Sequence, residues 1–181
     1  MPKLQIANDA FEKALEKTLR NEGGTANVTH DKGGTTNHGI SKAFLEKLSG
    51  GPVSSAYVLS LKMPEVIEIY RSHFWLKPKF QRIPFPALRE AVFDQGVNRG
   101  PGSAAKDLQR AIMKLSGLPL AIDGDIGPKT LSALEALDED ALLLSFMRES
   151  QMSYLKIVQS DHSQVKFLIG WIARTWTYKQ I

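Results

Sequence analysis

The sequence predicts a mostly α-helical protein, and three features of the chain support this prediction. Apolar residues recur three or four positions apart through most of the chain, which places them on one face of a helix. Glycine, proline and small polar residues separate these stretches where helices would begin and end. No stretch reads as a strand, apart from a small hairpin that we expect within residues 25–40.

The first half of the chain contains four expected helices. An amphipathic helix carries Phe11 and Leu15 and ends at Gly23-Gly24. Ser41 caps a second helix, which runs to Gly50, and a third helix-like run ends at Leu61. Pro64 then stands where a fourth helix begins, ending near Trp75.

The second half is also helical after a proline-rich connector. The connector covers 77–86 and leads to a helix that contains Leu88, Val92 and Phe93. A helix over 103–116 follows, which Gly117 stops, and a short helix begins at Gly127-Pro128. A long helix over 141–158, capped by Asp138 or Asp140, and a last helix over 163–178 complete the chain. In that last helix we expect one core-facing stripe made of Phe167, Leu168, Trp171, Ile172 and Trp176.

Composition limits the class of protein. The 181 residues are 43% hydrophobic and 23% charged, which suits one globular domain or a domain with a small appendage. The chain has no cysteine, which excludes disulfides and Cys-based zinc sites. The N-terminal segment lacks the apolar run of a signal peptide, and no stretch is long enough to insert in a membrane. We therefore expect a soluble protein that is not exported by a cleaved signal.

Charge is unevenly distributed around a net value of +4. Residues 71–114 hold nine Lys or Arg against three Asp or Glu, whereas residues 123–149 hold two against seven. A basic surface of this kind would attract anionic polymers such as teichoic acid, lipopolysaccharide or nucleic acid. The alternative, which we weight equally, is that these charges belong to ordinary solvent-exposed helix faces.

The segment from Arg20 to Ser41 holds the candidate chemistry. Glu22 shares the core-facing side of the first helix and lies at its C-terminal end, where the helix carbonyls and partial burial both favour the protonated acid. A carboxyl group kept protonated suits a general acid. Asp31 and Thr36 follow among glycines, which allow the loop to fold back and bring a second carboxylate and a hydroxyl to face Glu22. The alternative to a catalytic role is that Glu22 is a solvent-exposed glutamate at a helix end and that the loop after it is a Gly/Thr-rich turn.

This segment resembles the signature of glycoside hydrolase family 108. The matching residues are Glu22, Gly23, Gly24, Asn27, Asp31, Gly33, Gly34, Thr36, Gly39 and Ile40. The sequence departs from the family pattern at Thr25, where an aromatic residue is usual, and at Thr29, where proline is usual. Family members are lysozyme-like N-acetylmuramidases, found as phage endolysins and as bacterial proteins called secretion activators.

The resemblance implies a lysozyme-like fold spanning 1–181 as a single domain. The stretch Asp123–Thr130 also resembles a peptidoglycan-binding motif, so that 86–181 would include a peptidoglycan-binding-like helical lobe. The implied function is bacteriolytic, antimicrobial cleavage of the β-1,4 bond between N-acetylmuramic acid and N-acetylglucosamine. Glu22 would be the acid, Asp31 the second group and Thr36 its helper, with no cofactor and no metal. The protein would be made in the cytoplasm of a bacterial host and act on the cell wall after release.

Four further residues are candidates for substrate binding. Tyr70 and Trp75 are side chains of the type that stacks on sugars, and core packing is the alternative for this aromatic cluster. Asp94 and Asn98 lie one helical turn apart, so both side chains would reach the same cleft. The alternative for Asp94 is a structural hydrogen-bonding group. Gly170, Trp171 and Arg174 match a terminal G-W-x-x-R of the family.

Two other functions compete with the muramidase. A zinc amidase would use His30, His38 and His162, but their spacing matches no metal motif. A non-enzymatic basic module that binds the cell wall or nucleic acid is the other. Among partners we expect peptidoglycan glycan strands, with anionic cell-surface polymers as further candidates, and neither nucleic acid nor membrane.

Overall fold

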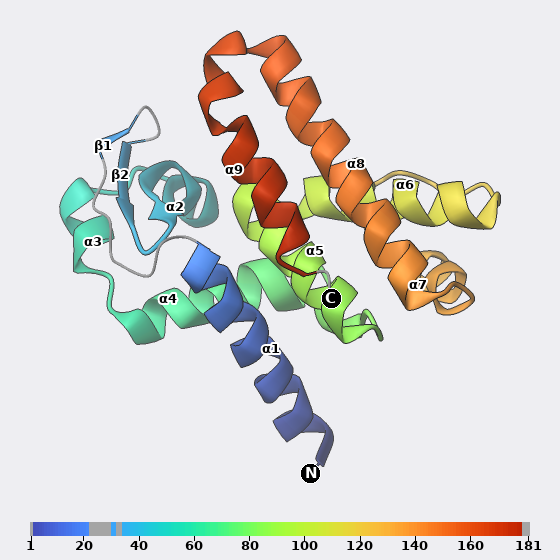
Figure 1. Cartoon of the computed structure of the whole chain (residues 1–181). Coiled ribbons are helices and arrows are strands. Elements are labelled where there is room, and N and C mark those ends of the chain that lie inside the picture. The colour runs from blue at the N-terminus through green and yellow to red at the C-terminus, as the bar shows by residue number, and fades with distance from the viewer. Residues whose placement is uncertain (1, 22–29, 32–33, 179–181) are drawn as a thin grey trace.

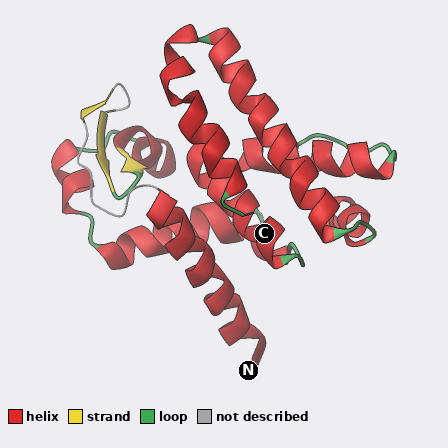
Figure 2. Cartoon of the chain, viewed as in Figure 1, coloured by secondary structure: helices red, strands yellow, loops and turns green. Residues whose placement is uncertain are grey.

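The computed structural model describes residues 2–21, 30–31 and 34–178 (Figure 1). Most of the described residues are helical, as predicted (Figure 2). Sheet structure in this part of the chain is confined to three short strands that follow the first helix. No helix among these residues is both long enough and apolar enough to cross a membrane.

Helix α1 (Pro2–Asn21) buries the face that its apolar spacing predicts. Phe11, Ala14, Leu15 and Thr18 are all buried. The ring of Phe11 meets those of Trp75 and Phe93 edge to face, with centroids 5.7 and 6.0 Å apart. The helix ends one residue before Glu22, so packing of its inner face fixes where the chain enters the next segment.

The strands form a small antiparallel sheet in the order β1 (His30–Asp31), β2 (Gly34–Asn37) and β3 (Ile40–Ser41). Asp31 pairs with Gly34, and Thr36 pairs with Ser41. The turn between β2 and β3 uses two left-handed residues, His38 with φ 48° and Gly39 with φ 78°. The predicted hairpin is therefore present and lies at the predicted place.

Two side chains fasten this sheet to the helices beside it. The amide nitrogen of Asn37 donates to the carbonyls of Val58 at 2.9 Å and Leu61 at 3.3 Å. The hydroxyl of Tyr70 donates to the carbonyl of His38 at 2.9 Å. Because Asn37 and Tyr70 are buried, these bonds hold strand β2 and its turn in one position.

The helices that follow the sheet begin and end as predicted. In α2 (Lys42–Ser49) the Ser41 hydroxyl accepts from the Phe44 amide at 3.1 Å, and Gly50 ends the helix in the left-handed region. Helix α3 spans Ser55–Ser60 and α4 spans Met63–Ile69.

Helix α4 continues directly into a π-helical segment, Tyr70–Leu76. Its wider turn is visible in the bond from the Lys77 amide to the Ser72 carbonyl, five residues earlier, at 3.0 Å. This widening brings Tyr70, Phe74 and Trp75 to one buried side together. A short 3₁₀ turn at Phe80–Arg82 leads to the second half of the chain.

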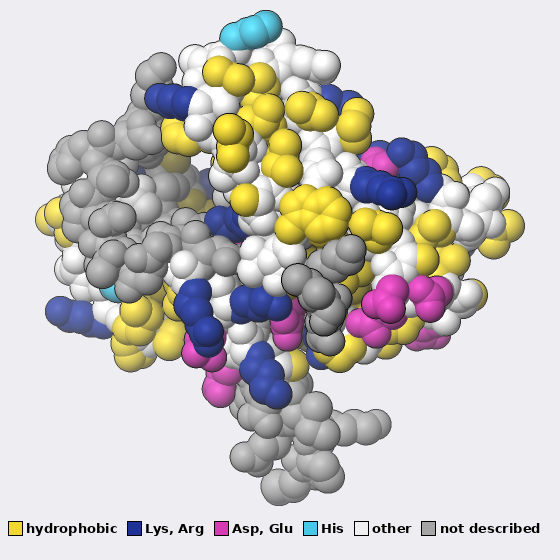
Figure 3. Space-filling view, viewed as in Figure 1, with side chains coloured by type: hydrophobic (Ala, Val, Ile, Leu, Met, Phe, Trp, Pro, Cys, Tyr) yellow, Lys and Arg dark blue, Asp and Glu magenta, His cyan; other side chains and the backbone are white. Residues whose placement is uncertain are grey.

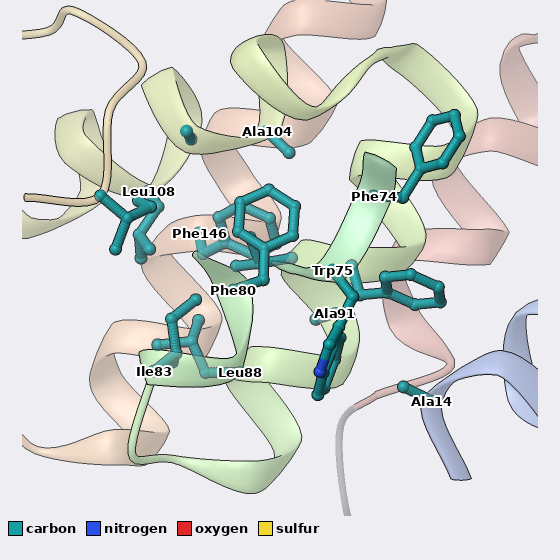
Figure 4. Close-up of a cluster of buried hydrophobic side chains, with 14 of the residues drawn as sticks. Ala14, Phe74, Trp75, Phe80, Ile83, Leu88, Ala91, Ala104, Leu108 and Phe146 are labelled. Atoms are coloured by element: carbon teal, nitrogen blue, oxygen red, sulfur yellow. The ribbon is translucent and has the colours of Figure 1, made fainter. Parts of the chain in front are cut away.

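Helices α5 (Pro86–Arg99), α6 (Pro101–Ser116), α7 (Pro128–Glu135), α8 (Glu139–Ser160) and α9 (Val165–Trp176) make up the second half. Asp138 caps α8, one of the two caps predicted. One cluster of buried apolar side chains runs through both halves, from Phe11 through Trp75 and Leu88 to Leu108 and Phe146 (Figure 4).

The core stripe predicted for the last helix is wrong at two of its five positions. Phe167 and Trp176 are 41% and 45% exposed, whereas Leu168, Trp171 and Ile172 are half-buried. The buried position within α9 is Thr175. The reason is that α9 lies at the surface, packed against α8 on one side, so that much of its apolar sequence faces outward. Figure 3 shows these apolar side chains gathered over α9 and the adjoining part of α8.

Candidate active site

The candidate site begins at the C-terminal end of α1, which delivers the chain to Glu22. Glu22 itself lies outside the described residues. The last turns of α1 meet α5 and the end of α9: the ammonium of Lys17 lies 3.3 Å from a carboxylate oxygen of Glu90 and 4.2 Å from the ring centre of Tyr178. The helix that precedes Glu22 in the sequence therefore packs, near its C-terminal end, against the residue Tyr178 that follows α9.

The other two predicted catalytic residues lie on the sheet. Thr36 is half-buried on β2, on the face opposite Thr35 and Asn37, which are buried. Asp31 pairs with Gly34, two residues before Thr36, so Asp31 and Thr36 are diagonal cross-strand neighbours. The side chain of Asp31 lies outside what the structure describes.

An open groove of about 520 Å³ lies between the end of α5 and α9. Its lining consists of Asn98 from α5, Lys166, Phe167, Gly170, Trp171, Ala173 and Arg174 from α9, and Thr177 after it. Gly170 leaves the helix backbone open, because a Cβ placed there would meet no atom within 4 Å. A groove with a flat backbone patch, aromatic edges and a few polar groups suits a sugar chain.

Asn98, one of the predicted substrate-binding residues, lines this groove. Its side-chain oxygen accepts from the Tyr154 hydroxyl at 2.7 Å, which fixes the orientation of the amide. The amide nitrogen makes no hydrogen bond to another described residue, so it is available to a ligand. Substrate contact by Asn98 stays a prediction, and its position favours it.

Asp94 is fully buried and already committed to another residue. Its two carboxylate oxygens lie 2.7 and 2.9 Å from the Nε and Nη2 atoms of Arg174. Burial, together with the charge of Asp94, raises the pKa of the neighbouring Tyr178 hydroxyl. The structural role considered for Asp94 fits this geometry, and substrate contact by Asp94 has no support from it.

Tyr70 and Trp75 are core residues in this structure, at 1% and 2% exposed. Trp75 packs edge to face against Phe93, and Figure 4 shows it within the cluster of buried side chains. Neither ring presents a face to the groove, so stacking on a sugar would require the core to open. The prediction that they line a sugar subsite is not supported by this packing.

Comparison with known proteins places these observations in a family. Residues 15–100 match the model for glycosyl hydrolase 108, and residues 103–176 match the model for a predicted peptidoglycan domain. The solved structure of SagA from Brucella abortus has a TM-score of 0.78 at 29% sequence identity, covering 94% of this chain and 92% of that one. Residues 15–100 are a glycosyl hydrolase 108 domain. A comparison with curated proteins gives no match.

The two matched regions together support a glycoside hydrolase that acts on peptidoglycan. The boundary between the two matched regions falls at residues 101–102, where α5 gives way to α6. The groove uses residues from both regions, Asn98 from the first and α9 from the second.

Several groove residues were missed by reasoning from the sequence. Phe167 and Trp171 were assigned to a core stripe, because apolar spacing does not reveal which helix lies at the surface. Gly170 and Arg174 were noticed as part of a terminal motif without a role. The motif was the available signal, since a glycine one helical turn before an arginine places both on one helix face.

The described side chains also bear on the zinc-amidase alternative. No group of three His, Asp or Glu residues close enough to hold a metal ion occurs there, a statement that does not extend to His30. The zinc-amidase alternative therefore has no donor set in this part of the chain.

Proposed function

We propose that this protein is an N-acetylmuramidase that cleaves the β-1,4 bond between N-acetylmuramic acid and N-acetylglucosamine, with Glu22 as general acid. One observation carries the proposal. Glu22 follows α1 directly in the sequence, and Lys17 in the last turns of α1 contacts Glu90 and Tyr178, the residue after Thr177, which lines the groove. The carbonyl end of a helix favours a protonated carboxyl group, as protonation of a leaving oxygen requires.

The remaining roles follow from the hairpin. Glu22 protonates the glycosidic oxygen, and positive charge develops on the sugar ring as the bond breaks. Asp31 orients a water molecule or steadies that charge, and the Thr36 hydroxyl assists. The buried bonds from Asn37 and Tyr70 support this assignment because they give the Thr36 strand a fixed position. The groove holds the glycan, with Asn98 as a hydrogen-bonding group.

The decisive experiment replaces the acid while keeping its shape. Glu22→Gln should reduce the release of reducing sugar from purified peptidoglycan by roughly 10²–10⁴-fold, the usual contribution of a general acid. Glu16→Gln is the matched control, since Glu16 lies on the same helix, is exposed, and pairs with Arg20 at 2.5 Å. Activity of the parent should survive a chelator. Activity of Glu22→Gln within a few-fold of the parent would refute the proposal.

The biological role we propose is that of a phage or prophage endolysin. The matches to a glycosyl hydrolase 108 domain and a predicted peptidoglycan domain support it, because an endolysin must act on the cell wall. Such an enzyme waits in the cytoplasm until the membrane is opened. Production in a bacterial host should leave the culture intact, and chloroform should then cause rapid loss of turbidity. Cells producing Glu22→Gln should not clear. Spontaneous clearing by the parent before chloroform would argue against this role.

A further inference from the structure

A second cavity, of about 530 Å³, lies within the predicted peptidoglycan domain. It is formed where the end of α5 meets α6, α8 and α9. Four cationic side chains line it, Arg99, Lys106, Arg110 and Lys156, against one anionic side chain, Asp107. The cavity therefore has an excess of positive charge.

The two arginines are already neutralised. Arg99 and Arg110 both pair with Asp107, Arg99 at 2.5 Å, and the Ser153 hydroxyl donates to the same carboxylate at 2.8 Å. Arg110 also lies 3.3 Å from a carboxylate oxygen of Glu149. These contacts hold the two arginine side chains in fixed positions on one side of the cavity, so a ligand would bind without having to immobilise them.

Lys106 and Lys156 differ from the arginines. Both side chains are exposed, and neither forms an ion pair with any residue that the structure describes. They come from different helices, Lys106 from α6 and Lys156 from α8, and line the same cavity. Lys106 still interacts with one acidic group, because its charge adds to the hydrogen bonds from Asp125 and Gln109 that lower the pKa of the Asp123 carboxyl. Without a direct ion pair, the ammonium groups of Lys106 and Lys156 provide charge for an anionic ligand.

The cavity is joined to the groove of the candidate active site. Asn98 and Trp171 line both spaces. Trp171 is held there by stacking on Tyr154, with ring centres 5.0 Å apart and planes 18° apart, and Arg99 lies 4.7 Å from the centre of the Tyr154 ring. A branched ligand can therefore occupy the groove and send a branch past Trp171 into the basic cavity.

We propose that this cavity binds the carboxylate groups of the peptide stems of peptidoglycan while the glycan strand lies in the groove. This inference rests on the proposed function. Peptidoglycan combines a glycan backbone without charge on its main chain with short peptides that carry free carboxylates. The cavity and the groove differ in charge in the same way. In the cavity, positive charge is concentrated at Lys106 and Lys156. In the groove, Asp94 neutralises Arg174, and the rest of the lining is largely apolar or amide, with Lys166 at its edge.

Nucleic acid fits this arrangement less well. A strand with a phosphate at every residue requires positive charge along its whole path. Here two lysines line one cavity, and the adjoining groove adds Lys166 at its edge, which is short of a continuous basic path among the described residues.

The test compares binding to whole peptidoglycan with binding to the same polymer whose free carboxylates have been converted to amides, which we call the stripped glycan because its carboxylate charge has been removed. Both are measured by co-sedimentation with the full-length Glu22→Gln protein, so that cleavage does not interfere. The double substitution Lys106→Ala with Lys156→Ala should weaken binding to whole peptidoglycan about three- to tenfold, as expected for two exposed charges. Binding to stripped glycan should not change. Raising the salt from about 0.1 M to about 1 M should abolish the difference.

Lys129→Ala is the matched control, an exposed lysine on α7 of the same domain that should leave both measurements unchanged. Equal weakening on whole and stripped polymer, or no weakening on either, would overturn the proposal. So would a double variant that loses binding to a DNA oligonucleotide while keeping its binding to peptidoglycan. Because binding is measured without cleavage, failure here is distinct from failure of Glu22 as the acid, which only the lysis assay reports.

Discussion

Asp94 and Arg174, eighty positions apart in the chain, form a two-point ion pair in the interior. Nε and Nη2 of Arg174 lie 2.7 and 2.9 Å from the two carboxylate oxygens, and Asp94 is fully buried. Asp94 belongs to the glycosyl hydrolase region and Arg174 to the predicted peptidoglycan domain. The pair therefore joins the two matched regions next to the groove.

Breaking this pair should destabilise the protein strongly. Arg174→Ala leaves the Asp94 carboxylate buried without its partner, a change that typically costs about 3–5 kcal/mol in the free energy of unfolding. Urea unfolding of parent and variant measures the difference. The control is Arg20→Ala, whose pair with Glu16 is exposed and should contribute little. A loss below about 1 kcal/mol for Arg174→Ala would contradict the buried geometry.

The two matched regions should also unfold together. The cluster of buried apolar side chains passes from α1 through α5 to α8 without a break at the boundary, so neither region has a core of its own. We therefore expect a single calorimetric transition whose van't Hoff and calorimetric enthalpies agree. Two separated transitions would show that the regions are independent domains and would contradict the single domain predicted from the sequence.

Local signals in the sequence predicted much of the fold. Ser41 and Gly50 bound α2 as predicted, because capping depends on a side chain or a backbone angle within one turn. Asp138 at the start of α8 is a second case. The strands appear where glycines and threonines interrupt the helical spacing. Such features depend on neighbours in the chain, which is why a single sequence reveals them.

Features that depend on distant contacts were not predictable in the same way. Trp75 and Phe167 are both aromatic residues at helical spacing, yet Trp75 is buried and Phe167 is exposed. The difference is that α9 has a partner on one side, whereas the π-helical segment is enclosed by α1 and α5. The partner of Asp94 lies eighty residues away, and no local rule points to it. The positions of the Glu22 and Asp31 side chains stay predictions.

Gly39 and Tyr70 should be energetically coupled. Gly39 has φ 78°, and a Cβ there would lie 2.5 Å from the Tyr70 hydroxyl oxygen. Gly39→Ala should therefore cost about 1 kcal/mol for the backbone angle, with a further cost for the clash. In a Tyr70→Phe background the oxygen is absent and only the backbone cost should remain.

A double-mutant cycle of unfolding free energies measures this coupling. Gly102→Ala is the control, because its Cβ would meet no atom within 4 Å and the residue is helical without a positive φ. We expect that change to be neutral or slightly stabilising. Equal costs of Gly39→Ala in the two backgrounds would show that the hydroxyl does not limit the turn.

Stability should fall at alkaline pH because of two buried phenols. Burial raises the pKa of both Tyr178 and Tyr154 above the ordinary value of a phenol. The folded state thus keeps both protons while the unfolded chain releases them above about pH 10, so the stabilisation present below that pH is lost as pH rises. Each retained proton contributes a slope of about 1.4 kcal/mol per pH unit.

Tyr178→Phe should remove one of these two contributions and reduce the slope between about pH 10 and 11. Chemical unfolding at a series of pH values measures it. Tyr57→Phe is the control, because Tyr57 is exposed and its replacement should leave the slope as in the parent. An unchanged slope in Tyr178→Phe would mean that this phenol is accessible to hydroxide in the folded protein.

The outcome at the anomeric carbon should reveal how Asp31 works. A retaining glycosidase holds its two carboxyl groups about 5–5.5 Å apart, whereas an inverting one holds them about 6.5–9.5 Å apart so that water fits between them. By backbone register, Asp31 and Thr36 are diagonal neighbours on a sheet that Asn37 and Tyr70 fix to the helices. Our hypothesis is that the Asp31 carboxylate and the Thr36 hydroxyl position one water molecule. We therefore expect direct attack by water and inversion, so that proton NMR detects the α-anomer first.

Asp31→Asn should lose most activity without trapping a glycosyl-enzyme, while Thr36→Val should lose less, because the hydroxyl only assists. A β-anomer as the first product would rule out inversion, and full activity of Asp31→Asn would reduce Asp31 to a structural residue of the loop.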